Sequence, residues 1–306
     1  MTKGNGASNI KPPNITFLIG MFSVCIPVFN EEESLSRIYE NVKNSTLWRK
    51  SARKEMIFCV NGSTDSSERV AREIAGADGS VKLIVLKEKG KNRAWNEMRR
   101  RSDKNSDTLF FLDTDVVLPE NTLERLSKEL ERNPGIAAAG AKAAFLREPT
   151  KRKEFVRRMI MEAKANPERL TQNFLHGRCY AIRRDEAEKI DMPKDQRIHE
   201  DAFLSLKLWG RFAVANDALV YSHAPNMVDA LRTHRRTEVS NILIRKHYPK
   251  LAPLLAQLTW SDAQARKRMK GKALRMGAKI YRKATARWAV ALGTETWTKS
   301  KSTKPK

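Results

Sequence analysis

Apolar runs alternate with segments of periodic apolar residues along the first half of the chain. Five apolar runs bounded by polar residues predict buried β-strands. They lie at 22–28, 56–60, 81–86, 108–112 and 136–141. After the first run, apolar residues recur every three or four positions from Leu35 to Val42, which predicts one face of a helix. Strands that alternate with helices predict an α/β fold, with a doubly wound, mostly parallel sheet and helices on both faces.

The second half of the chain has a less regular pattern. It predicts a basic helix at 150–166, strands at 177–184 and 219–225, a helix within 199–209 and a long helix through Arg245. The expected domain organisation follows from both halves. We expect a disordered extension at 1–20, one α/β domain at 21–248 with halves of about 21–145 and 146–248, and a basic amphipathic helical tail at 249–306.

The charge of the chain is strongly positive and unevenly distributed. Lys and Arg number 59 against 35 Asp and Glu, a formal net charge of +24. From Arg245 to the end there are 17 basic and 2 acidic residues, so this segment alone carries +15. Such asymmetry indicates an anionic partner for the tail: a membrane surface, nucleic acid or another polyanion.

The cysteines and the longest apolar stretch indicate a cytoplasmic protein. Cys25, Cys59 and Cys179 form neither an even set nor a metal-binding spacing, so we expect buried free thiols in a reducing compartment. The stretch from Ile15 to Phe29 is short for a membrane span and is interrupted by polar residues and Pro. Any membrane association is therefore expected to be peripheral.

Each of the predicted strands 22–28, 56–60, 81–86 and 108–112 ends in a polar loop. The loops read PVFNEEE, NGSTD, EKGKNRAWNE and DTDV. In doubly wound sheets, ligands bind at the carboxyl ends of the strands, where these loops gather. In the first loop, Asn30 is expected to cap the following helix and Glu31 to lie in its first turn.

The loop after the fourth strand carries two carboxylates, Asp113 and Asp115. Side chains at positions i and i+2 of an extended segment point the same way, so both carboxylates are expected to face one spot. Two neighbouring carboxylates repel each other unless a cation or a shared proton relieves them. The pair therefore predicts a divalent cation, although Asp is also common in solvated turns.

These motifs, in this order, resemble those of the family-2 glycosyltransferases with the GT-A fold. The resemblance runs from about Phe22 to about Arg236. It rests on IPVFNEEESL (26–35), VNGSTD (60–65), LDTD (112–115), the acidic pair Glu200-Asp201 and, loosely, RTHRR (232–236). It implies a metal-dependent, inverting enzyme that moves a sugar from a nucleotide donor to a hydroxyl acceptor, with the donor bound by the first half of the domain.

The resemblance also implies a set of donor-binding residues. The metal, Mn²⁺ or Mg²⁺, would be held by Asp115, with Asp113 toward the metal or the ribose. The nucleotide sugar would contact Pro27, Phe29, Asn30, Glu31, Asn61, Lys91, Arg93 and Asn96. The resemblance favours a UDP-sugar as the donor. Asn61 departs from it, because the family usually has Asp at this position, but the Asn amide can still pair with a uracil edge. Tight turns and solvated basic helix starts are the plain structural alternatives for these positions.

On the acceptor side, Asp201 would act as the general base and Glu200 would orient the acceptor. The alternative is that both acids simply open a helix, where the helix dipole favours them. Arg232 and Arg235 would grip the leaving diphosphate, because guanidinium groups pair bidentately with phosphate. The implied acceptor is a lipid-linked or cell-envelope glycan.

The tail has an apolar stripe from Met269 to Ala291 with most of its Lys and Arg outside it. This pattern is typical of an interfacial helix on an anionic membrane, here the inner face; packing of the stripe on the protein's own domain is the alternative. Two other functional classes stay open. A nucleic-acid- or polyanion-binding protein would explain the charge but not the acidic loops, and the chain could be an inactive relative of the family.

Overall fold

The computed structural model describes residues 20–146, 171–225, 227–258, 260–261 and 290. The expected helix at 150–166, the extension at 1–20 apart from Gly20, and most of the tail lie outside these residues. The strands are β1 (Met21–Val28), β2 (Lys54–Asn61), β3 (Val81–Leu86), β4 (Ser106–Leu112), β5 (Val116–Val117), β6 (Ala138–Phe145), β7 (Thr171–Gln172), β8 (Cys179–Arg183), β9 (Phe212–Ser222) and β10 (Trp260–Ser261).

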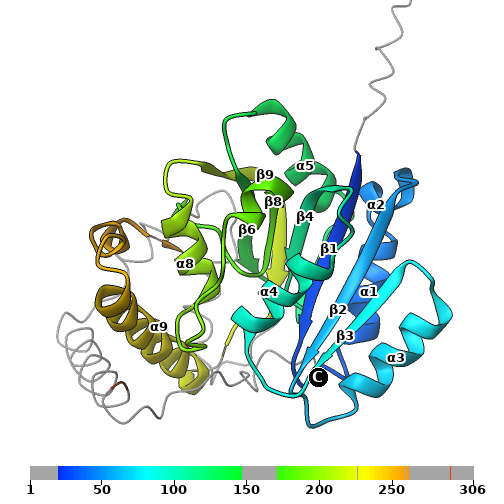
Figure 1. Cartoon of the computed structure of the whole chain (residues 1–306), viewed down its shortest axis with the longest axis horizontal. Helices are drawn as coiled ribbons and strands as arrows, with labels where there is room; N and C mark the ends of the chain where they lie inside the picture. Colours follow the sequence, from blue (N-terminus) through cyan, green and yellow to red (C-terminus); the bar gives the residue numbers. More distant parts are fainter. Residues whose placement is uncertain (1–19, 147–170, 226, 259, 262–289, 291–306) are drawn as a thin grey trace, which may run out of the picture.

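The helices surround a central sheet (Figure 1). They are α1 (Leu35–Lys43), α2 (Thr46–Lys50), α3 (Ser67–Ala77), α4 (Lys91–Arg101), α5 (Thr122–Arg132), α7 (Arg184–Glu188), α8 (Glu200–Lys207), α9 (Met227–His247) and the 3₁₀ helix η2 (Ala252–Gln257). No helix among the described residues is both long enough and apolar enough to span a bilayer.

The main sheet has eight strands in the order β3-β2-β1-β4-β8-β6-β9-β5. The first four strands in this order run parallel, as expected. Beyond them the sheet is mixed: β8 pairs antiparallel with both β4 and β6, while β6 and β9 are parallel. The predicted α/β sheet with helices on both faces is confirmed, with an antiparallel strand at its centre.

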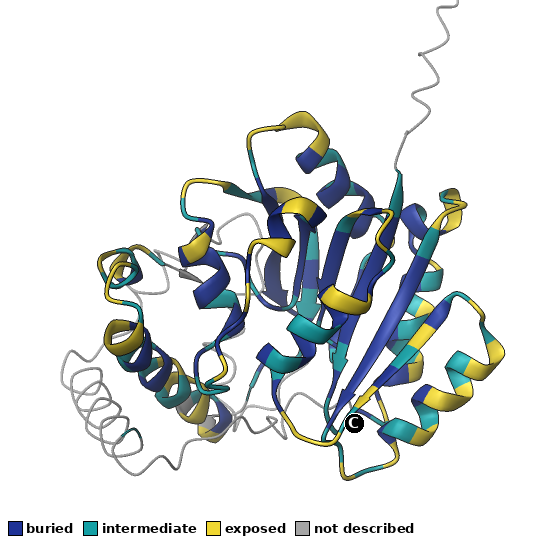
Figure 2. Ribbon diagram, in the orientation of Figure 1, coloured by how far each residue is buried: buried dark blue, intermediate teal, exposed yellow. Residues whose placement is uncertain are grey.

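Alternate residues of the strands contribute to two separate hydrophobic cores, one on each face of the sheet. Figure 2 shows that the central strands are largely buried. In β1, Val24 and Ile26 pack in one core with α1, α2, α3 and α5. Cys25, between them, points to the other core with Ile57 of β2 and residues of α4, α8 and α9. Because successive strand residues point to opposite faces, runs buried on both sides must be apolar throughout. This explains why the strands could be recognised from sequence.

The three cysteines lie inside these layers. Cys25, Cys59 and Cys179 are all buried and free, as predicted. Burial raises the pKa of each thiol, to about 12 for Cys59. They are therefore protonated core residues, because a thiolate would have to lose its hydration.

The start of α1 differs from the prediction. The helix begins at Leu35, its cap position is Ser34, and no acidic residue lies in its first turn. Asn30 instead adopts a left-handed backbone conformation with φ of 53°, a conformation that Asn tolerates better than most residues. Its side-chain oxygen accepts a hydrogen bond from Thr64 N at 2.8 Å. Asn30 thus joins the first two loops and does not cap the helix.

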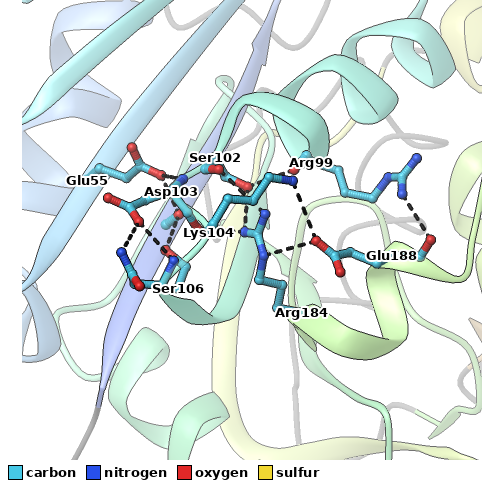
Figure 3. A network of polar contacts seen from close by, with 10 residues as sticks. Glu55, Arg99, Ser102, Asp103, Lys104, Ser106, Arg184 and Glu188 are labelled. Atoms are coloured by element: carbon cyan, nitrogen blue, oxygen red, sulfur yellow. Dashed lines mark hydrogen bonds and ion pairs between the residues drawn. The ribbon is translucent and has the colours of Figure 1, made fainter.

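A polar network fixes the C-terminal end of α4, away from the strand-end loops (Figure 3). Arg184 donates to Ser102 Oγ at 2.9 Å and to Asp103 O at 2.8 Å. Arg99 donates to the backbone oxygen of Glu188 at 3.1 Å. On the other side, Glu55 accepts from the backbone nitrogen of Asp103 at 2.6 Å. These contacts tie the C-terminal end of α4 to α7 and β2. They fix the position of the helix, whose first residue is Lys91.

Candidate active site

Three of the four polar loops, those after β1, β3 and β4, contribute to one pocket at the carboxyl ends of β1 and β4. Pro27, Lys91 and Asp113 line it from the loops of the first half of the domain. Gly177 and Glu200 line it from the second half. The pocket therefore lies where the two halves of the predicted domain meet.

An aromatic stack forms the floor of this pocket. The rings of Trp95 and Phe111 stack with centroids 5.0 Å apart, and Phe111 stacks on Tyr180 at 5.3 Å. Trp95 Nε1 donates to the Tyr180 hydroxyl at 2.8 Å. All three side chains are buried. They come from α4, β4 and β8, so the floor is rigid and spans both halves of the domain.

Lys91 connects carboxylates from the two halves. Its Nζ lies 2.6 Å from Asp113 Oδ1 and 2.5 Å from Glu200 Oε1. Burial alone would lower the pKa of Lys91, but these two carboxylates raise it well above its ordinary value. The amine therefore stays protonated. The same cation lowers the pKa of Glu200 against the opposing effect of burial.

Asp201 differs from its neighbour Glu200. Burial, and then the charge of Glu200, raise the pKa of Asp201 to about 7. Its Oδ1 accepts from Ala202 N at 2.8 Å, and its Oδ2 accepts from Gly177 N at 3.4 Å. Two adjacent carboxylates with displaced pKa values in opposite directions suit different tasks, and a carboxylate that titrates near neutrality suits proton transfer.

Asp113 and Asp115 lie between β4 and β5. Burial raises the pKa of Asp113 to about 6, and Asp115 adds to the increase. The backbone nitrogen of Asp113 donates to the oxygen of Arg178 at 3.0 Å. Within the described part of the chain, the carboxylate of Asp115 makes no hydrogen bond or ion pair, so it is available for a ligand.

The two aspartates fit a hard divalent cation. No group of three or more His, Cys, Asp and Glu residues in the described ranges is arranged to hold a metal ion. A Mg²⁺-type site, however, often takes only one or two protein carboxylates and completes its shell with substrate phosphates and water. Asp115, with Asp113 beside it, provides that donor set.

Two of the predicted donor-binding amides are used inside the fold. Asn61 is 1% exposed; its Nδ2 donates to Val28 O at 2.9 Å and its Oδ1 accepts from Gly90 N at 3.0 Å. Asn96 exchanges two hydrogen bonds with the backbone of Met192, at 2.9 and 3.2 Å. These amides hold the loops after β1, β2 and β3 and the segment before α8 in place. The structure thus gives them a supporting position behind the pocket.

Three further residues predicted to contact the donor do not line the pocket. Glu31 is buried, and its backbone nitrogen donates to Ser67 Oγ at 2.7 Å. Phe29 is half-buried in the same loop. Arg93 pairs with Glu88 at 2.6 Å on the outer side of α4. None of these three is among the residues that line the pocket described above.

The arginines of α9 are not gathered at the pocket. Arg232 is 59% exposed and pairs with Asp229 of its own helix at 3.3 Å. Arg235 is half-buried. Burial, and then the positive charge of Arg236, lower the pKa of His199 to about 4. His199 also donates its backbone N–H to Ser240 Oγ at 2.9 Å, so it joins the start of α8 to α9.

Sequence reasoning missed one charged residue of the site, Arg178. Its guanidinium lies 5.1 Å from the ring centroid of Phe145 and is close enough to Asp115, Asp113 and Asp201 for their charges to act on its pKa. Burial lowers its pKa, and these three carboxylates oppose that effect. The sequence feature that could have indicated Arg178 is its place near the start of the predicted strand 177–184, as a cation close to the acidic motifs.

Comparisons with known proteins agree with this geometry. Residues 23–191, more than half of the chain, match the family described as Glycosyl transferase family 2. An undecaprenyl-phosphate 4-deoxy-4-formamido-L-arabinose transferase of Klebsiella pneumoniae is 31% identical over 111 residues, 36% of this chain and 33% of that protein. The minor teichoic acid biosynthesis protein GgaA of Bacillus subtilis is 29% identical over 105 residues, 34% of this chain and 23% of that protein. The matches thus span a third or less of these relatives.

Solved structures share the fold over more of the chain. The mannosyltransferase PcManGT from Pyrobaculum calidifontis, in complex with GDP-Man and Mn²⁺, has a TM-score of 0.57 at 17% identity over 94% of this chain and 92% of that chain. GalNAc-T7 with UDP, GalNAc and Mn²⁺ has a TM-score of 0.52 at 17% identity over 73% and 48%. The predicted GT-A fold is confirmed for the described domain. Because the family match covers the first-strand motif and both strand-end aspartates, the chain belongs to glycosyl transferase family 2.

Proposed function

We propose that the protein is a metal-dependent, inverting glycosyltransferase that moves a sugar from a nucleoside diphosphate to a hydroxyl of a lipid-linked or cell-envelope glycan. The observation that carries the proposal is the meeting of Asp113 with Glu200 at one pocket, bridged by Lys91. A donor-side carboxylate and the acceptor-side acids thereby lie around one space. Such an arrangement suits direct transfer between two bound substrates.

Charge balance supports the metal. Four carboxylates gather at the site, those of Asp113, Asp115, Glu200 and Asp201, against the two cations Lys91 and Arg178. With all six groups ionised, two negative charges remain uncompensated. One divalent cation would neutralise them, and when bound it would offset the charge that develops on the leaving diphosphate.

The protein's own groups supply the rest of the mechanism. Asp201 takes the proton of the acceptor hydroxyl as that oxygen attacks the anomeric carbon. Gly177 N and Ala202 N hold its carboxylate through the hydrogen bonds described above. Arg178 faces the donor-side aspartates, so it is placed to meet an anionic diphosphate better than exposed Arg232. Attack from the side opposite the leaving group inverts the anomeric centre.

The donor class is tested by a screen. The full-length protein is incubated with UDP-sugars and GDP-sugars, with Mn²⁺, Mg²⁺ or chelator, and release of UDP or GDP is measured. We propose a UDP-sugar from the motif resemblance; the buried Asn61 amide would act through the loops it holds, not by pairing with the base. Release from no donor under any metal condition would contradict the proposed function.

The proposed acceptor places the enzyme at a membrane surface. The tail from 262 onward, apart from Val290, lies outside the described residues, so this part rests on its sequence pattern. Within the expected tail at 249–306, Trp260 and Ser261 pair with Gln172 and Thr171, just before the turn that carries Gly177. A basic segment that binds anionic lipid after Ser261 would therefore begin beside the proposed acceptor side of the site.

Removing the tail is expected to abolish binding to anionic membranes. Each Lys or Arg near an anionic bilayer contributes about 1 kcal/mol, so loss of the many basic residues after Ser261 should be decisive at low salt. Full-length protein and a variant that ends at Ser261, which retains β10, are compared by co-sedimentation with vesicles with and without phosphatidylglycerol. Equal sedimentation of the two proteins, or no preference for the anionic vesicles, would contradict the membrane role.

A further inference from the structure

Lys91 is the first residue of α4 and is enclosed by the pocket. Its side chain is 19% exposed, and that of Glu200 is 10% exposed. An ammonium group has three hydrogens to donate, and here two of them point at carboxylates, Asp113 Oδ1 and Glu200 Oε1. The side chain that the family resemblance assigns to the nucleotide-sugar donor is therefore already paired with carboxylates from both halves of the domain.

Gly177 makes this arrangement possible. A Cβ added at Gly177 would lie 2.4 Å from Glu200 Oε1 and 3.0 Å from Lys91 Nζ. A non-bonded contact of 2.4 Å is too short for any side chain, so the ion pair lies directly against the glycine backbone. The backbone N–H of the same glycine donates to Asp201 Oδ2 at 3.4 Å. One turn thus limits the positions of both acceptor-side acids.

The base of Lys91 is also fixed. One turn along α4, Trp95 is held in the aromatic stack by its hydrogen bond to Tyr180. The far end of the helix is tied to α7 through Arg99 and Arg184 (Figure 3). Because the backbone of Lys91 is held in place, its ammonium group can orient the carboxylate that pairs with it.

We propose that Lys91 is a positioning residue that orients Glu200, and through it the acceptor, and that it is not a ligand of the donor's phosphates. The inference rests on the proposed transferase function. Without Lys91, the carboxylate of Glu200 would be buried with no cation beside it and would turn toward water or take up a proton. The acceptor would then lose an oriented hydrogen-bond acceptor, while Asp115 would remain available to the donor complex.

The two roles predict opposite effects for Lys91→Met. If Lys91 is a positioning residue, its removal lowers kcat/KM for the acceptor by about 10- to 100-fold, the range expected for a buried hydrogen bond to a charged group. Binding of UDP or GDP with Mn²⁺ then changes by less than about threefold. If Lys91 is instead a phosphate ligand, its removal weakens nucleotide binding by about tenfold or more and leaves the KM for the acceptor unchanged. Titration calorimetry with each nucleotide and Mn²⁺, together with acceptor kinetics, separates these results.

Three further variants complete the test. Lys43→Met removes an ion pair of equal length, 2.6 Å to Asp78, far from the pocket, and is expected to leave both measurements unchanged. The double variant Lys91→Met/Glu200→Gln should have the acceptor kcat/KM of Glu200→Gln alone, because Lys91 acts through Glu200. Gly177→Ala, which pushes the ion pair away from the backbone, should reproduce the acceptor defect and keeps the test valid if Lys91→Met does not fold.

The outcomes distinguish this inference from the proposed function. If the wild-type protein transfers sugar but Lys91→Met loses nucleotide binding and keeps its acceptor kinetics, the positioning role is wrong and the proposed function stands. Additive losses in the double variant would also overturn the positioning role. If the wild-type protein binds nucleotide with Mn²⁺ but transfers no sugar to any glycan or lipid acceptor, the proposed function itself fails.

Discussion

Asp115→Ala is expected to reduce sugar transfer by at least about 10³-fold, because the carboxylate proposed to hold the metal contributes several kcal/mol to stabilising the transition-state charge. Mn²⁺-dependent binding of UDP or GDP should be lost as well. The fold should persist, since Asp115 lies in the short loop between β4 and β5 and its carboxylate makes no hydrogen bond or ion pair within the described residues. Transfer assays, calorimetry and the melting temperature measure these three effects.

Asp185→Ala provides the control for this prediction. Asp185 lies on α7 with its side chain 71% exposed and a single long ion pair of 3.8 Å to Lys189. Its removal should change neither transfer nor metal-dependent nucleotide binding. Full activity of Asp115→Ala, or of the wild-type enzyme in excess chelator, would exclude a metal-assisted mechanism.

Asp201→Asn is expected to lower kcat by about 10²–10⁴-fold, the usual contribution of a general base. Asparagine keeps the shape of the side chain and an acceptor oxygen, but it cannot take the acceptor's proton. Binding of UDP or GDP with Mn²⁺ should barely change, because Asp201 contacts Ala202 N and Gly177 N on the acceptor side. A collapse of nucleotide binding in this variant would place the Glu200-Asp201 pair in the donor site and the base elsewhere.

The pH profile gives the same assignment an independent check. Asp201 must be deprotonated to act as a base, and burial together with Glu200 raises its pKa to about 7 in the free enzyme. Activity should therefore rise with pH through about 7 and level off above it, since kcat/KM reports the pKa values of the free enzyme. The residual activity of Asp201→Asn should lack this rise. An unchanged acid limb in the variant would assign it to another group.

Strands β1, β2 and β4 could be predicted because most of their residues are buried, on both faces of the sheet, which makes their sequences almost continuously apolar. Strand direction could not. Cys179 to Arg183 reads as a strand either way, and only its partners β4 and β6 show that it runs antiparallel. The start of α1 was misplaced for a related reason. Asn is a common helix-capping residue, but Asn30 adopts a left-handed backbone conformation and lies four residues before Ser34, the actual cap position of α1.

The sequence indicated which loops carry polar residues but not which contacts those residues make. A polar residue at a strand end can serve a ligand or the backbone, and sequence does not distinguish the two. Asn61 and Asn96 serve the backbone. Lys91 and Arg93 are two residues apart on one helix, yet one enters the pocket and the other pairs with Glu88 outside it. Such differences depend on how α4 lies on the sheet, which no local pattern specifies.

The pairing of β7 with β10 has a consequence for how the chain is completed during synthesis. The strands that carry the donor loops, β1 to β4, are contiguous and have all been made once residue 112 has left the ribosome. The segment before Gly177 must wait for Trp260 and Ser261, nearly 90 residues after its own strand has been made. The strand-end loop that holds Asp113 and Asp115 is therefore synthesised long before the segment beside Gly177 gains its partner strand.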